Sequence, residues 1–289
     1  MVEVRDFDTS AKITWCPGCG NFTILTAAKQ VFAELVNEGK VKKENIVILS
    51  GIGCHAKICD YINVNSFYSL HGRVPAPATG IKLANPDLLV VGFAGDGDAY
   101  GEGFEHLLFA AKRNSDITMI IHNNRLYALT TGQFAPTSPA RFPGKSTPKG
   151  APEEPLNPIA IMLASGATFV ARTFAGDLDH VKRIFREAFL HRGFAIVDVL
   201  QPCVSFLNTY EFYRERVYDL QEEGHDPSDF EQAMKKAREW NYTDGESGRI
   251  PIGVFYRVEK PTFEELVLRG EKLCDLPIPE VEGILKSHR

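Results

Sequence analysis

The chain has 289 residues, of which 44% are hydrophobic and 24% are charged, and its formal net charge is −5. This length is enough to bury a large core in one α/β domain or in two small ones. Because Lys and Arg are scattered singly in an acidic chain, the sequence offers no basic face for a phosphate backbone and argues against a nucleic-acid partner.

No apolar run is long enough to span a bilayer, and the first ten residues, MVEVRDFDTS, carry charges where a signal peptide would be apolar. We therefore expect a cytoplasmic protein without a membrane partner. In that reducing compartment, cysteines are more plausible as metal ligands or buried thiols than as a disulfide framework. The six are Cys16, Cys19, Cys54, Cys59, Cys203 and Cys274.

Short, nearly all-apolar runs predict parallel strands that are buried on both faces. These runs are residues 45–54, 87–98, 116–124, 167–173 and 193–203. Segments with helical spacing precede or separate them, at 21–39, 103–114, 157–167 and 177–193. Because strand and helix alternate, we expect an α/β fold with a doubly wound, mostly parallel sheet. Such a sheet binds its ligands at the carboxyl ends of the strands.

Residues 134–158 contain seven prolines and predict a long loop. Because it leaves a strand at the predicted ligand-binding end, we interpret it as a lid or a partner-contacting loop. After Cys203 the chain becomes more charged. There we expect helices over 208–223 and 229–241, a strand over 249–258 and a helix from about Phe263. We divide the chain into a cofactor-binding domain, 1–205, and an extension for packing and for contacts between subunits, 206–289.

The segment 95–124 begins GDGDAYGEG and invites a dinucleotide-binding interpretation. Its glycines are Gly95, Gly97 and Gly101, whereas the dinucleotide fingerprint needs its third glycine where Tyr100 stands. The next strand also ends in His-Asn-Asn instead of an acidic residue for a ribose. A nicotinamide cofactor is therefore the weaker hypothesis.

What this segment offers is an oxygen ligand at the end of each of two successive strands, Asp96 and Asn124. Two hard oxygens, together with diphosphate oxygens and water, suit octahedral Mg²⁺. The flanking glycines let the backbone approach a diphosphate, and a helix N-terminus expected near Gly103 supplies positive potential.

The Gly-Asp-Gly turn followed by Asn-Asn resembles the thiamine diphosphate signature, and residues 95–133 resemble the beta subunit of 2-oxoacid:ferredoxin oxidoreductases. The similarity runs from Cys16 to about Cys203 and implies a thiamine diphosphate-binding fold. It assigns Mg²⁺ to Asp96, Asn124 and the backbone carbonyl of Leu126. It assigns cofactor contacts to Gly95, Gly97, Asp98, Ala128 and Leu129. Relatives carry glycines at Ala128 and Thr131, so the added side chains are expected to shape the substrate pocket, with Thr131 affecting specificity.

The spacing Cys16-x-x-Cys19 in TWCPGCG serves dithiol oxidoreductases, zinc sites and iron–sulfur clusters alike. Only the short, mostly polar segment VEVRDFDTSAKI comes before this motif, so the preceding strand-helix-strand context of a thioredoxin-like site is missing. A zinc site could use Cys54 with Cys59 or His55, all within CHAKIC. Against zinc, Cys203 follows a buried strand on the rim that also holds Cys54. The residues alone leave these alternatives open.

The family resemblance selects Cys16, Cys19, Cys54 and Cys203 as ligands of a [4Fe-4S] cluster, and leaves Cys59 and Cys274 as buried or incidental thiols. It also implies that a cofactor-binding turn comprises Ile52, Gly53, Cys54 and His55. Lys57 is expected near the substrate carboxylate and His71 beside the cofactor. His55 stands where relatives usually carry serine, so its role is open. The less favoured alternatives are that Lys57 is a surface lysine and that His71 is a cap or a core histidine.

The resemblance implies coenzyme A-dependent oxidative decarboxylation of a 2-oxoacid, with electrons passing through the cluster to ferredoxin. Thiamine diphosphate also needs a glutamate from a second domain, and this chain has strands for one sheet. An alpha subunit, or a fused gamma-alpha subunit, is therefore the expected partner. Two other classes remain open, a cluster-free thiamine diphosphate-dependent decarboxylase subunit and a zinc-stabilised binding module.

Overall fold

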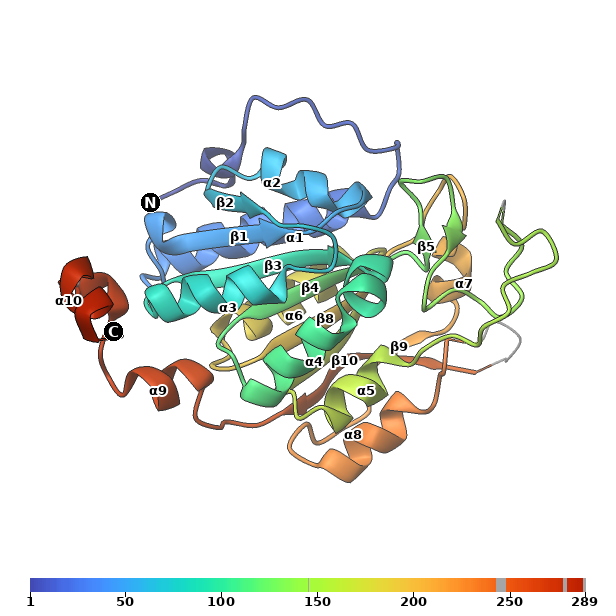
Figure 1. The fold of residues 1–289 in the computed structure, drawn as a ribbon. Helices are drawn as coiled ribbons and strands as arrows, with labels where there is room; N and C mark the ends of the chain where they lie inside the picture. The colour runs from blue at the N-terminus through green and yellow to red at the C-terminus, as the bar shows by residue number, and fades with distance from the viewer. Residues whose placement is uncertain (145, 243–247, 278–279, 288–289) are drawn as a thin grey trace.

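The computed structural model describes residues 1–144, 146–242, 248–277 and 280–287. Its strands are β1 (Ile46–Ser50), β2 (Asn65–Tyr68), β3 (Leu89–Gly95), β4 (Thr118–Asn123), β5 (Leu126–Tyr127), β6 (Gln133–Phe134), β7 (Phe169–Phe174), β8 (Ala195–Leu200), β9 (Val217–Asp219) and β10 (Ile250–Arg257). Eight of them form one central sheet, in the order β2-β1-β3-β4-β8-β7-β10-β9 (Figure 1). Neighbours are parallel except β10 against β7. β5 and β6 form a separate antiparallel hairpin.

The helices are α1 (Asn21–Asn37), α2 (Ile58–Tyr61), α3 (Pro75–Ala84), α4 (Phe104–Arg113), α5 (Pro158–Ala164), α6 (Leu178–Leu190), α7 (Tyr210–Arg214), α8 (Phe230–Ala237), α9 (Phe263–Leu268) and α10 (Val281–Ser287). Shorter helical turns are η1 (Val4–Phe7), η2 (Lys43–Asn45), η3 (Cys54–Lys57), the π-helical η4 (Gly97–Glu102) and η5 (Leu273–Asp275).

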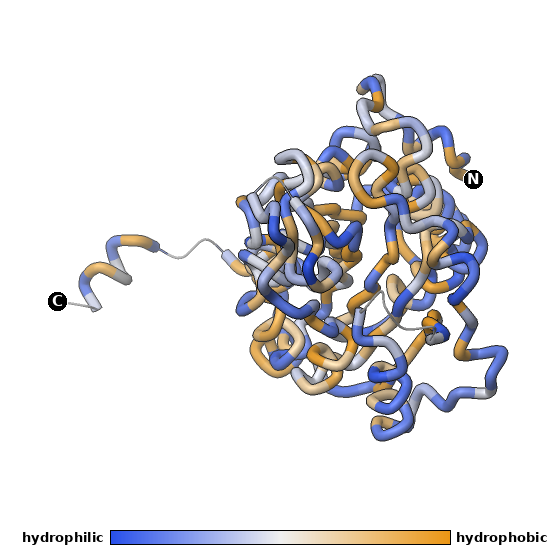
Figure 2. Tube along the Cα trace, turned by 90° about the vertical axis from the view of Figure 1, so that its right-hand side faces the viewer, coloured by the Kyte–Doolittle hydropathy of each residue, from blue (hydrophilic) through white to orange (hydrophobic). Residues whose placement is uncertain are grey.

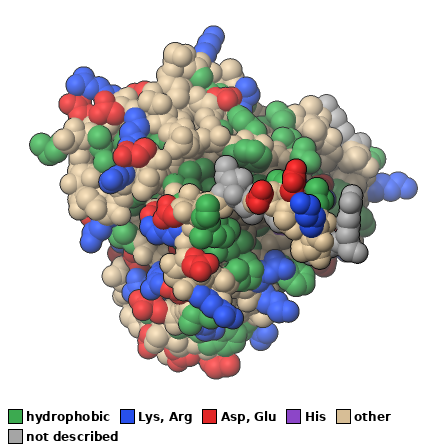
Figure 3. All heavy atoms as spheres, turned by 60° about the vertical axis from the view of Figure 1, so that its left-hand side comes forward, with side chains coloured by type: hydrophobic (Ala, Val, Ile, Leu, Met, Phe, Trp, Pro, Cys, Tyr) green, Lys and Arg blue, Asp and Glu red, His purple; other side chains and the backbone are tan. Residues whose placement is uncertain are grey.

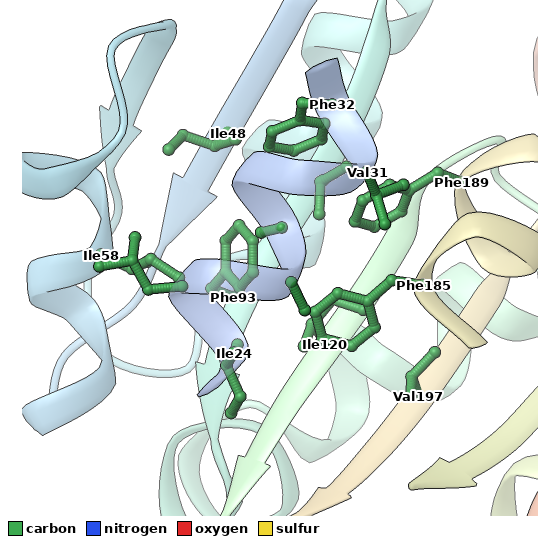
Figure 4. Close-up of a cluster of buried hydrophobic side chains, with 14 of the residues drawn as sticks. Ile24, Val31, Phe32, Ile48, Ile58, Phe93, Ile120, Phe185, Phe189 and Val197 are labelled. Carbon is green, nitrogen blue, oxygen red and sulfur yellow. The ribbon is translucent and has the colours of Figure 1, made fainter. Parts of the chain in front are cut away.

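Helices cover both faces of the sheet. On one face α1 and α6 pack together over the strands, and Phe32 stacks on Phe189 with ring centroids 5.1 Å apart (Figure 4). The same cluster includes Ile48, Phe93 and Ile120 from three neighbouring strands. The opposite face is covered by α3, α4, α5 and α8. The predicted α/β class with a doubly wound, mostly parallel sheet is therefore confirmed.

The C-terminal third departs from the prediction in its details. The helix expected over 208–223 ends at Arg214, and β9 follows it, because Val217 pairs with Ile250 in the neighbouring strand β10. Helix α8 ends at Ala237, before the predicted 241. The strand over 249–258 and the helix from Phe263 are confirmed as β10 and α9. Both β9 and β10 join the central sheet, so the residues after 205 extend it.

Figure 2 shows α10 projecting away from the rest of the chain. On the face drawn in Figure 3, Lys and Arg side chains are interspersed with Asp and Glu. Within the described residues, no helix is long and apolar enough to cross a membrane.

Candidate active site

A cleft of about 300 Å³ opens where β1, β3 and β4 end. Its lining contains every residue predicted to touch the thiamine cofactor or Mg²⁺, and four residues that were not predicted. The lining comprises Ile52, Gly53, Cys54, His55, His71, Gly95, Asp96, Gly97, Asp98, Glu102, Asn124, Leu126, Tyr127, Ala128, Leu129, Thr130 and Gln133. Parallel strands end on the same edge, and this edge is where such sheets bind ligands.

Asp96 and Asn124 lie on this wall, as the strand-end argument predicts. Asp96 is 1% exposed, and its Oδ2 accepts a hydrogen bond of 2.9 Å from the Thr137 hydroxyl. Burial raises the pKa of Asp96 to about 7. The side-chain oxygen of Asn124 accepts the Leu126 amide at 3.0 Å, which folds the chain so that Leu126 also faces the cleft. A bound cation would favour the ionised form of so buried a carboxylate, so these residues fit Mg²⁺.

Among the described residues, no group of three or more His, Cys, Asp and Glu side chains is arranged to hold a single metal ion. The predicted Mg²⁺ set would not form such a group, because it combines one carboxylate with an amide and a backbone carbonyl.

Asp98 lies buried behind the cleft, at 2% exposure. Its Oδ1 accepts the Gly72 amide at 2.7 Å and lies 2.6 Å from His71 Nδ1, while His55 Nε2 is 3.4 Å from Oδ2. Burial alone would raise the pKa of Asp98, but the neighbouring side chains of His55 and His71 outweigh it and hold the pKa well below its usual range. The hydrogen bond with Asp98 raises the pKa of His71. The Asp98 carboxylate thus links its own turn after β3 to the turn after β1 and to the loop after β2.

The helical turn after β3 begins earlier than predicted. The expected N-terminus near Gly103 does exist as the cap of α4, but η4 already starts at Gly97, directly after Asp96. A Cβ atom at Gly97 would lie 2.3 Å from Tyr127 Cε1, so only glycine fits there. Single π-helical turns are frequent at functional sites. Because η4 begins at Gly97, its first residues, Gly97 and Asp98, line the cleft.

The two residues predicted to act on the substrate, Lys57 and Thr131, lie outside the lining. Lys57 is exposed, and its Nζ is 3.9 Å from Asp60 Oδ2. Thr131 is also exposed, in the β5–β6 turn next to the lining residue Thr130, with a φ of +83°. A β-branched residue rarely adopts this left-handed conformation.

The TWCPGCG segment packs between the Cys54 turn and the chain that follows β8. Trp15 Nε1 donates to the Cys54 carbonyl at 2.6 Å. On the other side, Gln201 Nε2 lies 3.3 Å from Cys19 Sγ, and Ser205 Oγ lies 3.2 Å from Cys16 Sγ. Segments far apart in the sequence therefore bring the predicted cysteines to one place.

The thiols of these cysteines influence one another. Burial, and to a smaller extent Cys19, Cys203 and Cys16, raise the pKa of Cys54 to about 11. Burial likewise raises the pKa of Cys19, with added effects of Cys203 and Cys16. Cys54 and Cys19 therefore need a positively charged group beside them to become thiolates, and the iron atoms of a cluster would be such a group.

The zinc alternative built on CHAKIC does not fit the side chains. The Nε2 atom of His55 accepts the Gly95 amide at 3.1 Å and faces Asp98. Burial raises the pKa of Cys59 to about 11, and a hydrogen bond with Ser50 opposes that rise. Cys54, His55 and Cys59 therefore point to different surroundings.

A buried polar network behind the cleft was missed from the sequence. Asp198 in β8 is fully buried and accepts hydrogen bonds from Asn123 Nδ2 at 3.0 Å, Tyr100 at 2.9 Å and Tyr242 at 2.5 Å. Arg172 Nε lies 3.8 Å from it. The sequence does carry a sign of this network, because Arg172 and Asp198 are charged residues inside predicted buried strands that are otherwise mostly apolar.

The proline-rich loop also contributes to the site. Residues Ala135, Thr137 and Ser138 at its start are buried. This part therefore packs behind the cleft, where Thr137 contacts Asp96, and does not cover it, whereas Lys145 lies outside the described residues.

Two family models match the chain. The model "Thiamine pyrophosphate enzyme, C-terminal TPP binding domain" matches residues 51–199, and the C-terminal model of the pyruvate ferredoxin oxidoreductase beta subunit matches residues 203–271. The first match begins directly after β1, reaches into β8 and contains the whole cleft, so fold and site together define a thiamine pyrophosphate enzyme domain.

Relatives narrow this class to one family. The chain is 44% identical to 2-oxoacid:ferredoxin oxidoreductase 1, subunit beta, of Aeropyrum pernix, over 91% of this chain and 83% of that one. It is 41% identical to the 2-oxoacid:ferredoxin oxidoreductase beta subunit of Saccharolobus solfataricus, over 95% of this chain and 96% of that one. A solved structure is also similar, that of 2-oxoglutarate:ferredoxin oxidoreductase from Magnetococcus marinus with 2-oxoglutarate, coenzyme A and succinyl-CoA bound. It aligns with a TM-score of 0.88 at 34% identity, over 99% of this chain and 96% of that one.

The chain belongs to the beta subunits of 2-oxoacid:ferredoxin oxidoreductases. It is thus part of an enzyme, and membership among beta subunits implies an alpha subunit as its partner. The resemblance predicted from the sequence is confirmed.

Proposed function

We propose that this chain binds thiamine diphosphate and Mg²⁺ in the cleft and a [4Fe-4S] cluster on Cys16, Cys19, Cys54 and Cys203. Together with its alpha subunit, it would oxidise a 2-oxoacid to carbon dioxide and an acyl group carried by coenzyme A, and pass the electrons to ferredoxin. When bound, thiamine diphosphate supplies the carbanion chemistry of decarboxylation, and the cluster accepts electrons singly.

The observation that carries this proposal is the position of Cys54. It lines the cleft, and its thiol is also within the electrostatic reach of Cys16, Cys19 and Cys203. One turn would therefore touch both the thiamine cofactor and the cluster. Trp15 fixes that turn by donating a hydrogen bond to the Cys54 carbonyl. The turn would therefore give electrons a short path from the thiamine cofactor to the cluster.

The remaining residues would bind and orient. Asp96, Asn124 and the Leu126 carbonyl would hold Mg²⁺, while Gly95 and Gly97 let the backbone approach the diphosphate. The ion pair of Lys57 with Asp60 is long and exposed, and such pairs are weak, so Lys57 is free to swing toward a substrate carboxylate. Thr131 would restrict which 2-oxoacid enters.

Apolar side chains around the cleft support a partner that covers it. Ile52 and Leu129 line the cleft yet remain 43% and 59% exposed, and Leu70, beside His71, is 77% exposed. Exposed apolar groups at the rim of a polar site are typical of a surface that another subunit buries. We propose that the alpha subunit docks here. Residues after 205 would add packing and further contacts between the subunits.

The test is anaerobic purification of this chain with its alpha subunit, followed by analysis of iron, acid-labile sulfide and thiamine. We expect brown protein with iron and sulfide in equal amounts, about four of each per chain, and bound thiamine diphosphate. Colourless protein that carries thiamine diphosphate but no iron would instead indicate a cluster-free decarboxylase subunit. Zinc in place of iron would contradict the cluster.

A further inference from the structure

We propose that Thr137 is a positioning residue for the Mg²⁺ ligand Asp96. The inference rests on the proposed function of the cleft, and it concerns a residue that lies in the proline-rich loop, outside the cleft lining.

The Thr137 side chain is placed to fix the carboxylate. It is fully buried, and its Oγ1 lies 2.9 Å from Asp96 Oδ2 and 2.9 Å from Asn123 Oδ1. A hydroxyl has one hydrogen to donate. Hydrogen bonds to an ionised acceptor are the stronger ones, so beside a carboxylate that holds a cation this hydrogen goes to Asp96, while Asn123 Oδ1 still accepts the Arg125 amide at 3.2 Å. A hydrogen bond to one carboxylate oxygen of Asp96 fixes the rotation of the group about its Cβ–Cγ bond.

The backbone around Thr137 is itself held on both sides. Arg125 Nε donates to the Thr137 carbonyl at 2.8 Å, and Leu156 donates its amide to the Pro136 carbonyl at 2.8 Å. The Ser138 side chain accepts the Ala135 amide at 2.7 Å. The hydroxyl of Thr137 is therefore presented from a rigid segment, as a preorganised site requires.

The orientation of the neighbouring Asn123 amide is fixed as well. Its Nδ2 donates to Asp198 at 3.0 Å, and an amide that donates on one side must present its oxygen on the other, toward Thr137. Asp198 in turn accepts the Tyr242 hydroxyl from the C-terminal extension. A continuous line of buried polar groups thus runs from Tyr242 to Asp96.

Groups that hydrogen-bond a metal ligand orient it and tune its affinity, and their loss typically costs 10–100-fold in metal binding. The hydroxyl of Thr137 is in this position relative to Asp96, whereas its methyl group is not. Two substitutions therefore separate the roles, because valine keeps the shape of threonine without the hydroxyl and serine keeps the hydroxyl without the methyl group.

The test uses the complex of this chain with its alpha subunit. Mn²⁺ serves as the probe, since it shares the oxygen-ligand preference of Mg²⁺. Mn²⁺ is titrated in the presence of thiamine diphosphate, and the free ion is measured by electron paramagnetic resonance. We expect Thr137→Val to weaken Mn²⁺ binding about 10–100-fold, and Thr137→Ser to stay close to wild type. The melting temperature without Mn²⁺ checks the fold, and Thr137→Ala replaces the valine variant if that variant does not fold.

Wild-type-like Mn²⁺ binding by the hydroxyl-free variant, or equal losses in the serine and valine variants, would overturn the proposal while leaving the cofactor site intact. A wild-type complex that binds no Mn²⁺ in the presence of thiamine diphosphate would overturn the proposed function as well.

Discussion

His71 Nδ1 lies 2.6 Å from Asp98 Oδ1 at the wall of the cleft. This contact joins the loop that follows β2 to the π-helical turn that follows β3. Because Asp98 holds Nδ1, the other ring nitrogen, Nε2, is directed elsewhere, and it lies 3.7 Å from Glu102 Oε2, another cleft residue. The pair therefore gives His71 one orientation and a preference for the protonated form.

Asp98→Asn should lower the pKa of His71 toward its ordinary value of 6.5. In the wild type the folded-state pKa is raised, so the stabilising contribution of His71 is full below pH 6.5 and is lost as the pH rises through the folded-state pKa. NMR titration of ¹⁵N-histidine-labelled protein, with the His71 signal assigned from a His71→Gln spectrum, measures this pKa. An unchanged pKa in the Asp98→Asn variant would show that the contact does not control it.

Gly97→Ala should abolish tight binding of thiamine diphosphate. Its Cβ would approach Tyr127 Cε1 to 2.3 Å, and the Tyr127 hydroxyl is held by Glu102 at 3.1 Å, so the ring cannot move without losing that bond. Calorimetric titration with thiamine diphosphate and Mg²⁺ measures the loss. Gly80→Ala is the control, because Gly80 lies in α3 with no atom within 4 Å of its added Cβ. It should bind normally and gain roughly 0.5–1 kcal/mol of stability.

Cys203→Ser should lose the iron–sulfur cluster. Cys59→Ser is the matched control, since both side chains are buried, at 9% and 6% exposure, and Cys59 is not among the four proposed ligands. Iron and sulfide analysis should give full occupancy for Cys59→Ser and for the exposed Cys274→Ser. Equal iron content in Cys203→Ser and Cys59→Ser would contradict the ligand assignment.

Tyr242→Phe should lower the free energy of unfolding by about 1–3 kcal/mol. The hydroxyl of Tyr242 donates to Asp198 and accepts from Arg172 Nη2 at 3.1 Å, so its removal leaves buried charged partners short of a hydrogen bond. Urea denaturation measures the loss. Tyr256→Phe is the control, because the Tyr256 hydroxyl has no hydrogen bond with any described residue. An equal loss in both variants would assign the effect to aromatic packing.

The strand ends, and with them Asp96 and Asn124, could be predicted because buried parallel strands are continuous apolar runs. Strand β9 could not, because its partner β10 lies more than thirty residues away and local spacing around 208–223 is helical. The role proposed for Thr137 could not be predicted from the residues around it, because only the folded loop brings its side chain to Asp96. Asp198 was detectable as a charge in an apolar strand, but its partner Tyr242 was not.

The most direct test of the proposed function is anaerobic reduction of methyl viologen by the complex of this chain and its alpha subunit, with a 2-oxoacid and coenzyme A. We predict reduction that needs both subunits and both substrates and that disappears in Cys203→Ser. A complex that contains thiamine diphosphate and releases carbon dioxide from the 2-oxoacid, yet never reduces the dye, would contradict the account.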